Sequence, residues 1–155
     1  LGVFVRELNE SLYRITKGEK FLTFFIAIFD QESSQLQYVN AGHNPPLLVK
    51  KKEVTQLTKG STILGSFSEL PQVEVGQEAI NGETFLLMYT DGLTDVKNEK
   101  GDYFEEDLLQ EFAQSNHQQT ASDFNKALIE QIDRFKGDQS YPDDFTVLTC
   151  KLLQV

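Results

Sequence analysis

Two acidic motifs in this sequence each adjoin a run of apolar residues. Asp91 follows the apolar stretch at 85–89, and Asp143 and Asp144 directly precede the stretch at 145–153. A carboxylate beside a buried strand is costly to desolvate unless a backbone donor, a basic side chain or a cation compensates its charge. If the two stretches are antiparallel neighbours in one sheet, both acidic ends lie at the same edge of that sheet.

The chemistry that paired carboxylates favour is the binding of a hard divalent cation, Mg²⁺ or Mn²⁺, through oxygen ligands and water. Basic partners for the carboxylates are scarce, because the chain has only three arginines, Arg6, Arg14 and Arg134. Gly92, after Asp91, would let the backbone turn sharply beside such an ion. The alternative of plain turn chemistry stays open, since Asp-Gly is a common turn dipeptide and the acidic pair follows Pro142.

The helices that would support this edge are visible as apolar stripes. Leu1, Val5, Leu8, Leu12 and Ile15 recur at the spacing of one helix face, and we expect this helix to end near Thr16 with Gly18 as its C-cap. Residues 105–112 and 121–135 read as two further helices, the second opened by a capping box of Thr120 and Asp123.

The strands follow from β-branched and aromatic runs between turn-like segments. We expect a hairpin of strands at 20–30 and 36–42, a second hairpin over 45–58 and a short strand at 73–75. We expect the stretch at 84–90 to be buried on both faces, and the stretch at 145–153 to be covered on both faces as well. Because hairpin connections dominate, the pattern indicates an α+β fold with mostly antiparallel sheet.

Length, charge and cysteine content limit the classes of function. The chain has 155 residues, which suits one domain over 1–155, and a net charge of -10, which argues against nucleic acid and a membrane surface as partners. The longest apolar run, Phe21 to Phe29, is nine residues and cannot span a bilayer, which needs about 20. No signal peptide is visible, and the single cysteine, Cys150, suits a reducing compartment. We therefore expect a cytoplasmic protein.

Three motifs in a fixed order add a family resemblance. The segments AGHNPP at 41–46, YTDG at 89–92 and DDFT at 143–146 together resemble the PPM (PP2C-like) serine/threonine phosphatases. The match is to the bacterial branch that includes the stage II sporulation phosphatase and the phosphatases of sigma-factor control. This resemblance implies an α-β-β-α sandwich, in which two antiparallel sheets are flanked by helices. It also implies two Mn²⁺ or Mg²⁺ ions in the complete domain and a metal-activated water as the nucleophile.

The resemblance assigns roles to particular residues. It implies that Asp91 and Asp143 are metal ligands, and that Gly92 and Asp144 adjoin the metal site without being carried over as ligands. His43, in the AGHNPP segment, stands where many eukaryotic relatives have a metal-binding Asp. We expect His43 either to hold a water or contact the substrate, or to be a structural histidine with an internal hydrogen bond.

The family's G-D and D-G-x-G motifs, which lie upstream of its D-G motif, do not occur before Asp91 in this sequence. Asp102 follows a glycine but lies on the wrong side of Asp91. We therefore expect the chain to be the C-terminal portion of a phosphatase domain, with the N-terminal part missing and about half of the metal ligands present. Such a fragment is expected to be inactive or incomplete alone. It is also expected to self-associate through exposed sheet edges.

The leading hypothesis is a metal-dependent phosphatase that acts on phosphoserine or phosphothreonine of a regulatory protein. By the resemblance, the substrate is a phosphorylated anti-sigma-factor antagonist, and the parent chain carries an N-terminal sensor or receiver domain. Two rivals remain. One is a catalytically inactive PP2C-like domain that binds or regulates a partner, and the other is a structural α+β domain with acidic turns.

Overall fold

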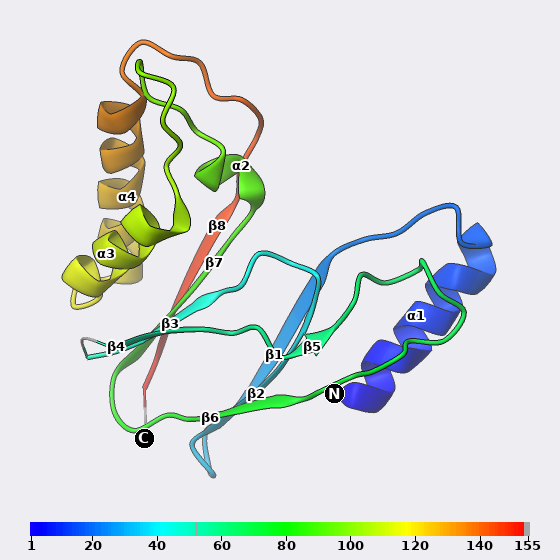
Figure 1. The fold of residues 1–155 in the computed structure, drawn as a ribbon. Helices are drawn as coiled ribbons and strands as arrows, with labels where there is room; N and C mark the ends of the chain where they lie inside the picture. Colours follow the sequence, from blue (N-terminus) through cyan, green and yellow to red (C-terminus); the bar gives the residue numbers. More distant parts are fainter. Residues whose placement is uncertain (52, 154–155) are drawn as a thin grey trace. The chain divides into compact units, whose positions relative to one another are not determined.

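The computed structural model describes residues 1–51 and 53–153, so Lys52 of the second predicted hairpin lies outside the described residues. The chain forms two compact units (Figure 1). The first unit contains Leu1–Pro45 and Leu57–Asn81, and the second contains Pro46–Gln56 and Gly82–Leu153. Among the described residues, no helix has the length and apolar character needed to cross a membrane. The assignment of 1–155 to a single domain stays a prediction.

Among the described residues, the first unit holds one helix, α1 (Gly2–Thr16), and a sheet of four strands, β1 (Phe24–Asp30), β2 (Gln35–Ala41), β5 (Gly60–Ser61) and β6 (Gly76–Ala79). β1 pairs antiparallel with β2, and β2 also pairs with β5 in parallel and with β6 antiparallel.

α1 was predicted from its apolar stripe, and the structure confirms it. Its inward face centres on Val5, which is fully buried, with Leu1, Leu8 and Leu12 packed against the same core. Ile15 was predicted on this face, but its side chain is 82% exposed, because the packed face ends one turn earlier. The prediction of Gly18 as the C-cap was also wrong.

The residue that ends α1 is Lys17, which adopts the left-handed conformation with φ of 54°. Gly18 follows with φ of 78°, so the reversal starts one residue before the glycine. Glycine usually takes this position because a side chain makes the conformation costly, and the sequence signal therefore pointed one residue too far.

The second unit is an antiparallel sheet in the order β4-β3-β7-β8, with helices packed on it. Its elements are β3 (Leu47–Lys50), β4 (Glu53–Gln56), β7 (Thr84–Tyr89), α2 (Asp91–Thr94), α3 (Glu106–Asn116), α4 (Ala121–Lys136) and β8 (Val147–Leu152). α3 contacts β3 and β4, while α4 contacts β8 (Figure 1).

The core of the second unit explains why β7 is buried. Phe85, Leu87 and Tyr89 on one face of β7 are at most 2% exposed and pack with residues of α3 and α4. The rings of Phe85 and Phe124 lie 4.5 Å apart between their centroids. Aromatic rings at this spacing contribute packing beyond their buried area, so Phe85 anchors the start of β7 on α4.

The predicted start of α4 is confirmed in its main feature. The Thr120 hydroxyl oxygen accepts a hydrogen bond from the Asp123 backbone N–H at 3.1 Å. The Thr120 hydroxyl in turn donates to the Asp123 carboxylate at 2.8 Å. In a full capping box, that carboxylate would instead accept from the Thr120 backbone N–H.

Some strands differ from the sequence-based expectation. The short strand predicted at 73–75 was wrong, because those residues form no strand and the strand of this segment is β6, at Gly76–Ala79. β5 was not expected at all. An added Cβ at Gly76 would collide with the Tyr38 ring of β2, with which β6 pairs, so this position needs a glycine. β8 was expected to be covered on both faces, yet Leu148 is 55% exposed.

Candidate metal centre

β7 and β8 are antiparallel neighbours, which is the arrangement that would bring the two acidic motifs to one edge of the sheet. Their paired residues run to Tyr89 opposite Val147. One step further, the Thr90 backbone N–H donates to the Thr146 carbonyl at 3.1 Å, and the Thr146 backbone N–H donates to the Thr90 hydroxyl oxygen at 2.9 Å. The residues after Thr90 and before Thr146 therefore emerge at one edge of the sheet, which confirms the shared edge predicted for the acidic ends.

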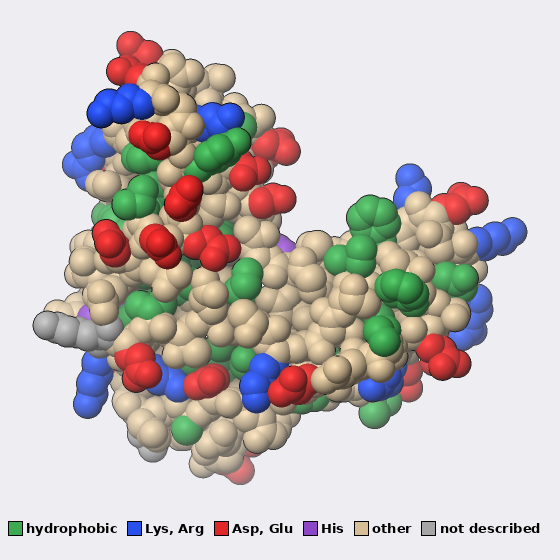
Figure 2. Space-filling model, viewed as in Figure 1, with side chains coloured by type: hydrophobic (Ala, Val, Ile, Leu, Met, Phe, Trp, Pro, Cys, Tyr) green, Lys and Arg blue, Asp and Glu red, His purple; other side chains and the backbone are tan. Residues whose placement is uncertain are grey.

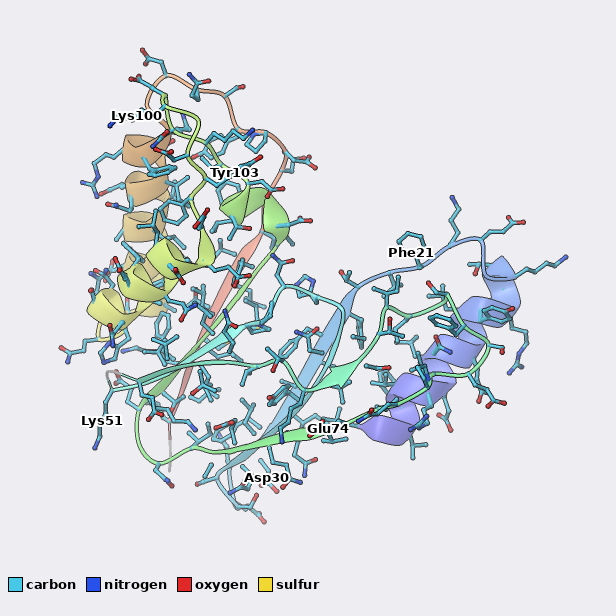
Figure 3. All side chains as sticks on the ribbon, in the orientation of Figure 1. Phe21, Asp30, Lys51, Glu74, Lys100 and Tyr103 are labelled. Carbon is cyan, nitrogen blue, oxygen red and sulfur yellow. The ribbon has the colours of Figure 1, made fainter. Side chains whose placement is uncertain are left out.

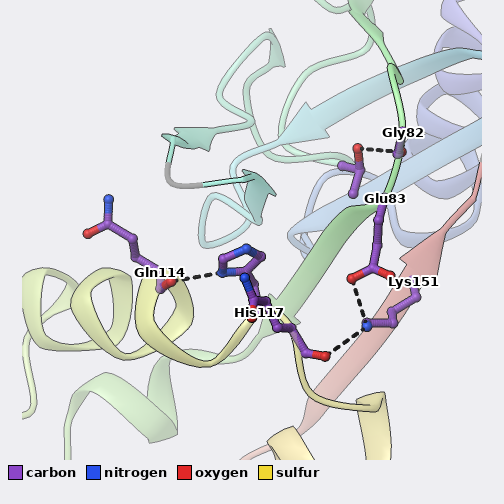
Figure 4. Close-up of polar contacts among 7 residues, drawn as sticks. Gly82, Glu83, Gln114, His117 and Lys151 are labelled. Carbon is purple, nitrogen blue, oxygen red and sulfur yellow. Dashed lines mark hydrogen bonds and ion pairs between the residues drawn. The ribbon is translucent and has the colours of Figure 1, made fainter.

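An ion pair between Lys151 and Glu83 lies at the opposite end of the β7–β8 strand pair. The Lys151 ammonium lies 2.9 Å from the Glu83 carboxylate and also donates to the Gln118 carbonyl at 3.3 Å (Figure 4). Both side chains are partly exposed, so this pair contributes little net stability. Its geometry nevertheless agrees with the strand register that brings Thr90 opposite Thr146 at the acidic end.

Asp91 is the first residue of α2, a single turn of helix that the sequence analysis did not predict. The Asp91 carbonyl accepts hydrogen bonds from the Asp95 backbone N–H at 2.9 Å and from the Thr94 hydroxyl at 3.0 Å. One carboxylate oxygen accepts from the Gly92 backbone N–H at 3.0 Å. The Asp91 side chain is exposed, so a cation from solvent can reach it.

Gly92 is buried where the two strand ends come together. A Cβ placed on it would lie 2.6 Å from the Asp144 carbonyl oxygen and 3.3 Å from the Phe145 Cβ. Gly92 is not among the glycines with positive φ, so the expected role in a sharp turn was wrong. Glycine is required here because the backbone of Asp144 occupies the space of a side chain.

Asp143 and Asp144 are both exposed, and Asp143 resembles Asp91 in its local geometry. One Asp143 carboxylate oxygen accepts from the next residue's backbone N–H, that of Asp144, at 2.8 Å. Asp91 and Asp143 thus each have one oxygen engaged with the backbone, which limits the rotation of the carboxylate. This restriction favours a defined binding geometry.

The donor set fits a hard divalent cation that keeps much of its water. Carboxylate oxygens are the ligands that Mg²⁺ and Mn²⁺ prefer, and Mg²⁺ is often bound through one or two carboxylates with water in the remaining positions. Over residues 1–51 and 53–153, no group of three or more Asp, Glu, His or Cys side chains is arranged to enclose an ion. The described residues therefore do not enclose an ion by themselves.

His43 lies in the first unit and has an internal partner. Its ring Nδ1 is 3.2 Å from the Thr23 hydroxyl. Its backbone is held on both sides by Asn40, whose side-chain oxygen accepts from the His43 N–H at 2.8 Å and whose side-chain nitrogen donates to the His43 carbonyl at 2.9 Å. These bonds are consistent with the structural role that was one of the two expectations for His43.

Asn40 was not singled out from the sequence. It is 4% exposed, and its side chain also donates to the Leu57 carbonyl at 3.1 Å. A signal existed, because Asn followed by a glycine-containing segment is typical of side chains that hydrogen-bond nearby backbone. Asn40 thus shapes the turn that presents His43.

An acidic cavity of about 420 Å³ lies next to α2 in the second unit. Tyr103 lies beside α2 at this cavity (Figure 3), and acidic side chains gather over the α2 to α4 region in the face shown by Figure 2. Glu106 and Asp107 belong to the first turn of α3. Acidic residues in the first turn of a helix interact favourably with the helix dipole, so the presence of Glu106 and Asp107 is explained without a bound ligand.

Tyr89 is buried beneath this edge. Burial raises the pKa of its phenol, and the charge of Glu106 raises the pKa further. Its hydroxyl has no hydrogen-bond partner among the described residues. Tyr89 is thus the last residue of β7 and part of the core of the second unit.

Comparison with known proteins gives a consistent picture. The profile of the family "Stage II sporulation protein E (SpoIIE)" matches residues 1–153. The phosphoserine phosphatase RsbU of Bacillus subtilis is 23% identical over 149 residues, which are 95% of this chain and 44% of RsbU. The chain therefore spans less than half the length of that relative.

Solved structures share the fold. The SiaA-PP2C domain of Pseudomonas aeruginosa superposes with a TM-score of 0.85 at 15% identity, covering 97% of this chain and 60% of that one. The RsbU and RsbW domains of Rv1364c from Mycobacterium tuberculosis give a TM-score of 0.67 at 27% identity, over 90% of this chain and 38% of that one. These likenesses confirm the predicted α+β, PP2C-like fold class.

Proposed function

The chain belongs to the SpoIIE family, and on that premise we propose that it forms part of a metal-dependent protein serine/threonine phosphatase. The reaction is hydrolysis of phosphoserine or phosphothreonine on a regulatory protein. The observation that carries the proposal is the pairing of β7 with β8, which brings the Asp91 and Asp143 ends of two strands to one sheet edge. A phosphatase of this kind needs carboxylates gathered at such an edge to hold its cation.

In this proposal Asp91 and Asp143 hold Mn²⁺ or Mg²⁺ through their carboxylate oxygens. The cation supplies a water of lowered pKa and neutralises charge on the phosphoryl group. The chain's own residues set the geometry. Gly92 leaves room for the Asp144 backbone, and the N–H groups of Gly92 and Asp144 each orient one carboxylate. By the resemblance, the complete domain holds two such ions, with further ligands supplied by segments outside this chain.

The proposal extends to the substrate protein, the parent chain and the cell compartment. We infer that the substrate is a phosphorylated anti-sigma-factor antagonist and that the parent protein carries a sensor or receiver domain. The name of RsbU as a phosphoserine phosphatase supports the substrate class. A mycobacterial protein that contains RsbU and RsbW domains supports a role among regulatory partners. The cytoplasm is the proposed compartment, because the chain's one cysteine, Cys150, is a free thiol.

The test is Mn²⁺-dependent phosphate release from a phosphoserine protein by the full-length natural protein that contains this chain. Asp91→Asn is expected to lower the rate by about 100-fold or more, because a transition-state charge loses its stabilising group. Asp138→Asn is the matched control, since Asp138 is an exposed carboxylate in the loop before β8. A wild-type rate for Asp91→Asn would overturn the metal assignment.

The alternative is a catalytically inactive PP2C-like domain that binds or regulates a partner. The observation that motivates it is that no G-D or D-G-x-G motif occurs upstream of Asp91 in this sequence. In the same assay this alternative predicts no phosphate release from wild type or Asp91→Asn, together with measurable binding of the phosphoprotein. Failure of the wild-type protein to bind either Mn²⁺ or the phosphoprotein would favour a purely structural domain.

A further inference from the structure

The loop between α4 and β8 carries Asp143, yet it has no regular secondary structure. Every residue from Gly137 to Asp144 is exposed. Exposed loops of this kind are mobile unless side chains tie them down. A metal-binding carboxylate needs a position held within about 0.5 Å by its surroundings. The contacts that restrain this loop therefore bear directly on Asp143.

Tyr141, two residues before Asp143, makes three contacts that fasten the loop. Its hydroxyl donates to the Asp133 carboxylate on α4 at 2.8 Å. Its ring lies 5.3 Å from the Phe145 ring between centroids, at an interplanar angle of 48°. The Lys136 ammonium lies 5.2 Å from the centre of the Tyr141 ring, within the range of a cation–π interaction.

Lys136 extends this restraint to the start of the loop. Its ammonium donates to the Gly137 carbonyl at 3.2 Å and to the Gln139 carbonyl at 3.1 Å. The same group lies 3.7 Å from the Asp133 carboxylate that Tyr141 also contacts, and the Lys136 side chain is only 17% exposed. Asp133 and Lys136 together therefore form a fixed platform at the C-terminal end of α4 for the Tyr141 side chain.

Phe145 anchors the far side of Asp143. It packs against the core of the second unit, and the next residue, Thr146, is hydrogen-bonded to Thr90 at the end of β7. Tyr141 and Phe145 stand two residues before and two residues after Asp143. Because their rings are in contact, the chain between them must bend back on itself, and Asp143 occupies the apex of that bend.

We propose that Tyr141, held by Asp133 and Lys136, is a positioning residue that fixes Asp143 for cation binding. This inference rests on the proposed function, which makes Asp143 a ligand. Tyr141 does not touch the cation. It acts by closing the bend against Phe145, so that the Asp143 carboxylate is in place before the cation arrives and little ordering is needed on binding.

The experiment measures the Mn²⁺ dissociation constant of the full-length protein by calorimetric titration, without substrate. Tyr141→Ala removes both the ring contact and the hydroxyl, and it is expected to weaken Mn²⁺ binding by about 10- to 100-fold, as loss of a ligand's supporting partner does elsewhere. Tyr141→Phe keeps the ring contact with Phe145 and loses one hydrogen bond. It is expected to weaken Mn²⁺ binding by about fivefold at most, which is less than the loss in Tyr141→Ala.

Tyr103→Ala is the matched control. Tyr103 is also an exposed tyrosine of the second unit, with a lysine ammonium 4.5 Å from its ring centre, but it lies in a different loop. We expect this variant to bind Mn²⁺ as the wild type does. Equal losses in Tyr141→Ala and Tyr103→Ala would show a general effect on the fold and overturn the positioning role.

The assay separates this inference from the proposed function. If the wild type binds Mn²⁺ and Asp143→Asn does not, while Tyr141→Ala binds normally, the positioning role alone is overturned. If the wild type does not bind Mn²⁺, the metal assignment fails and the positioning role with it. Amide hydrogen exchange of Asp144 and Phe145 gives a readout without metal. Faster exchange in Tyr141→Ala than in Tyr103→Ala is expected, and equal exchange would count against the bend.

Discussion

The residues at the acidic ends of β7 and β8 are closely packed. Gly92 faces the Asp144 carbonyl, and Thr90 meets Thr146 in a pair of hydrogen bonds. Buried atoms at this packing density transmit any added volume to their neighbours. A change at Gly92 therefore acts on the segment that carries Asp143, although Gly92 itself provides no ligand atom.

Gly92→Ala is expected to lower the free energy of unfolding by about 1–3 kcal/mol, the usual cost of inserting a methyl group into a packed site. Since the colliding atom is backbone at 2.6 Å, the strand end must shift, and Mn²⁺ affinity is expected to fall as well. Urea unfolding followed by circular dichroism measures the first effect. Gly2→Ala is the control, because its Cβ would make ordinary contacts with the Val75 side chain at 3.5 Å and the Val73 side chain at 3.9 Å. Equal stability of the two variants would contradict the close approach.

At the scale of elements, the turn after β2 depends on a single buried side chain. Asn40 bonds the His43 backbone twice and the Leu57 carbonyl once, so it ties the end of β2 to the segment before β5. Without the Asn40 side chain, the His43 N–H and the His43 and Leu57 carbonyls would lose these hydrogen bonds. The turn that presents His43 is thus specified by hydrogen bonds and not by its glycine alone.

Asn40→Ala is expected to destabilise the protein by about 1–3 kcal/mol, because buried donors and acceptors lose their partners. Gln37→Ala on the same strand is the control, since Gln37 is exposed, and its effect is expected to stay within about 0.5 kcal/mol. Urea unfolding of both variants checks the prediction. A loss for Asn40→Ala no larger than for Gln37→Ala would show that the turn forms without this side chain.

At the scale of the whole molecule, β1 stands at the edge of its sheet among the described residues. The Asn40 backbone N–H bonds the Lys59 carbonyl and so points away from β1. Phe25, which lies opposite Asn40, therefore directs its backbone N–H and C=O away from β2. Because every second residue of an antiparallel strand points its backbone groups to the same side, Ala27 and Phe29 do the same. β1 has no charged residue before Asp30, and an edge strand of this kind invites pairing with another chain.

We expect the 155-residue chain by itself to self-associate through this edge of β1 with a second copy. Ile28, which is 53% exposed, offers a test: Ile28→Lys is expected to shift sedimentation toward the monomer at micromolar concentration. Leu148→Lys is the control, with the same substitution at 55% exposure on β8. Because the net charge is -10, higher salt should strengthen association. A monomeric wild type, or equal effects of both variants, would contradict pairing through β1.

Much of the secondary structure could be predicted from local pattern. α1 and α4 carry apolar residues at helical spacing, and β7 is an apolar run bounded by turn residues, so each is visible within its own segment. α2, β5 and β6 are too short to show a period. β5 and β6 form through pairing with β2, and Gly76 of β6 leaves room for the Tyr38 ring. Lys17 was missed because its left-handed conformation carries no residue-type signal.

The sequence by itself determined where the carboxylates stand in the chain and which segments become strands, because both follow from residue type and periodicity. Only the tertiary structure decided that the two acidic ends meet. That meeting depends on the register between Thr90 and Thr146, which lie 56 residues apart, and on the absence of a side chain at Gly92. The bend around Asp143 likewise depends on ring and hydrogen-bond contacts of Tyr141. Contacts of this kind arise from packing in three dimensions, and no local pattern encodes them.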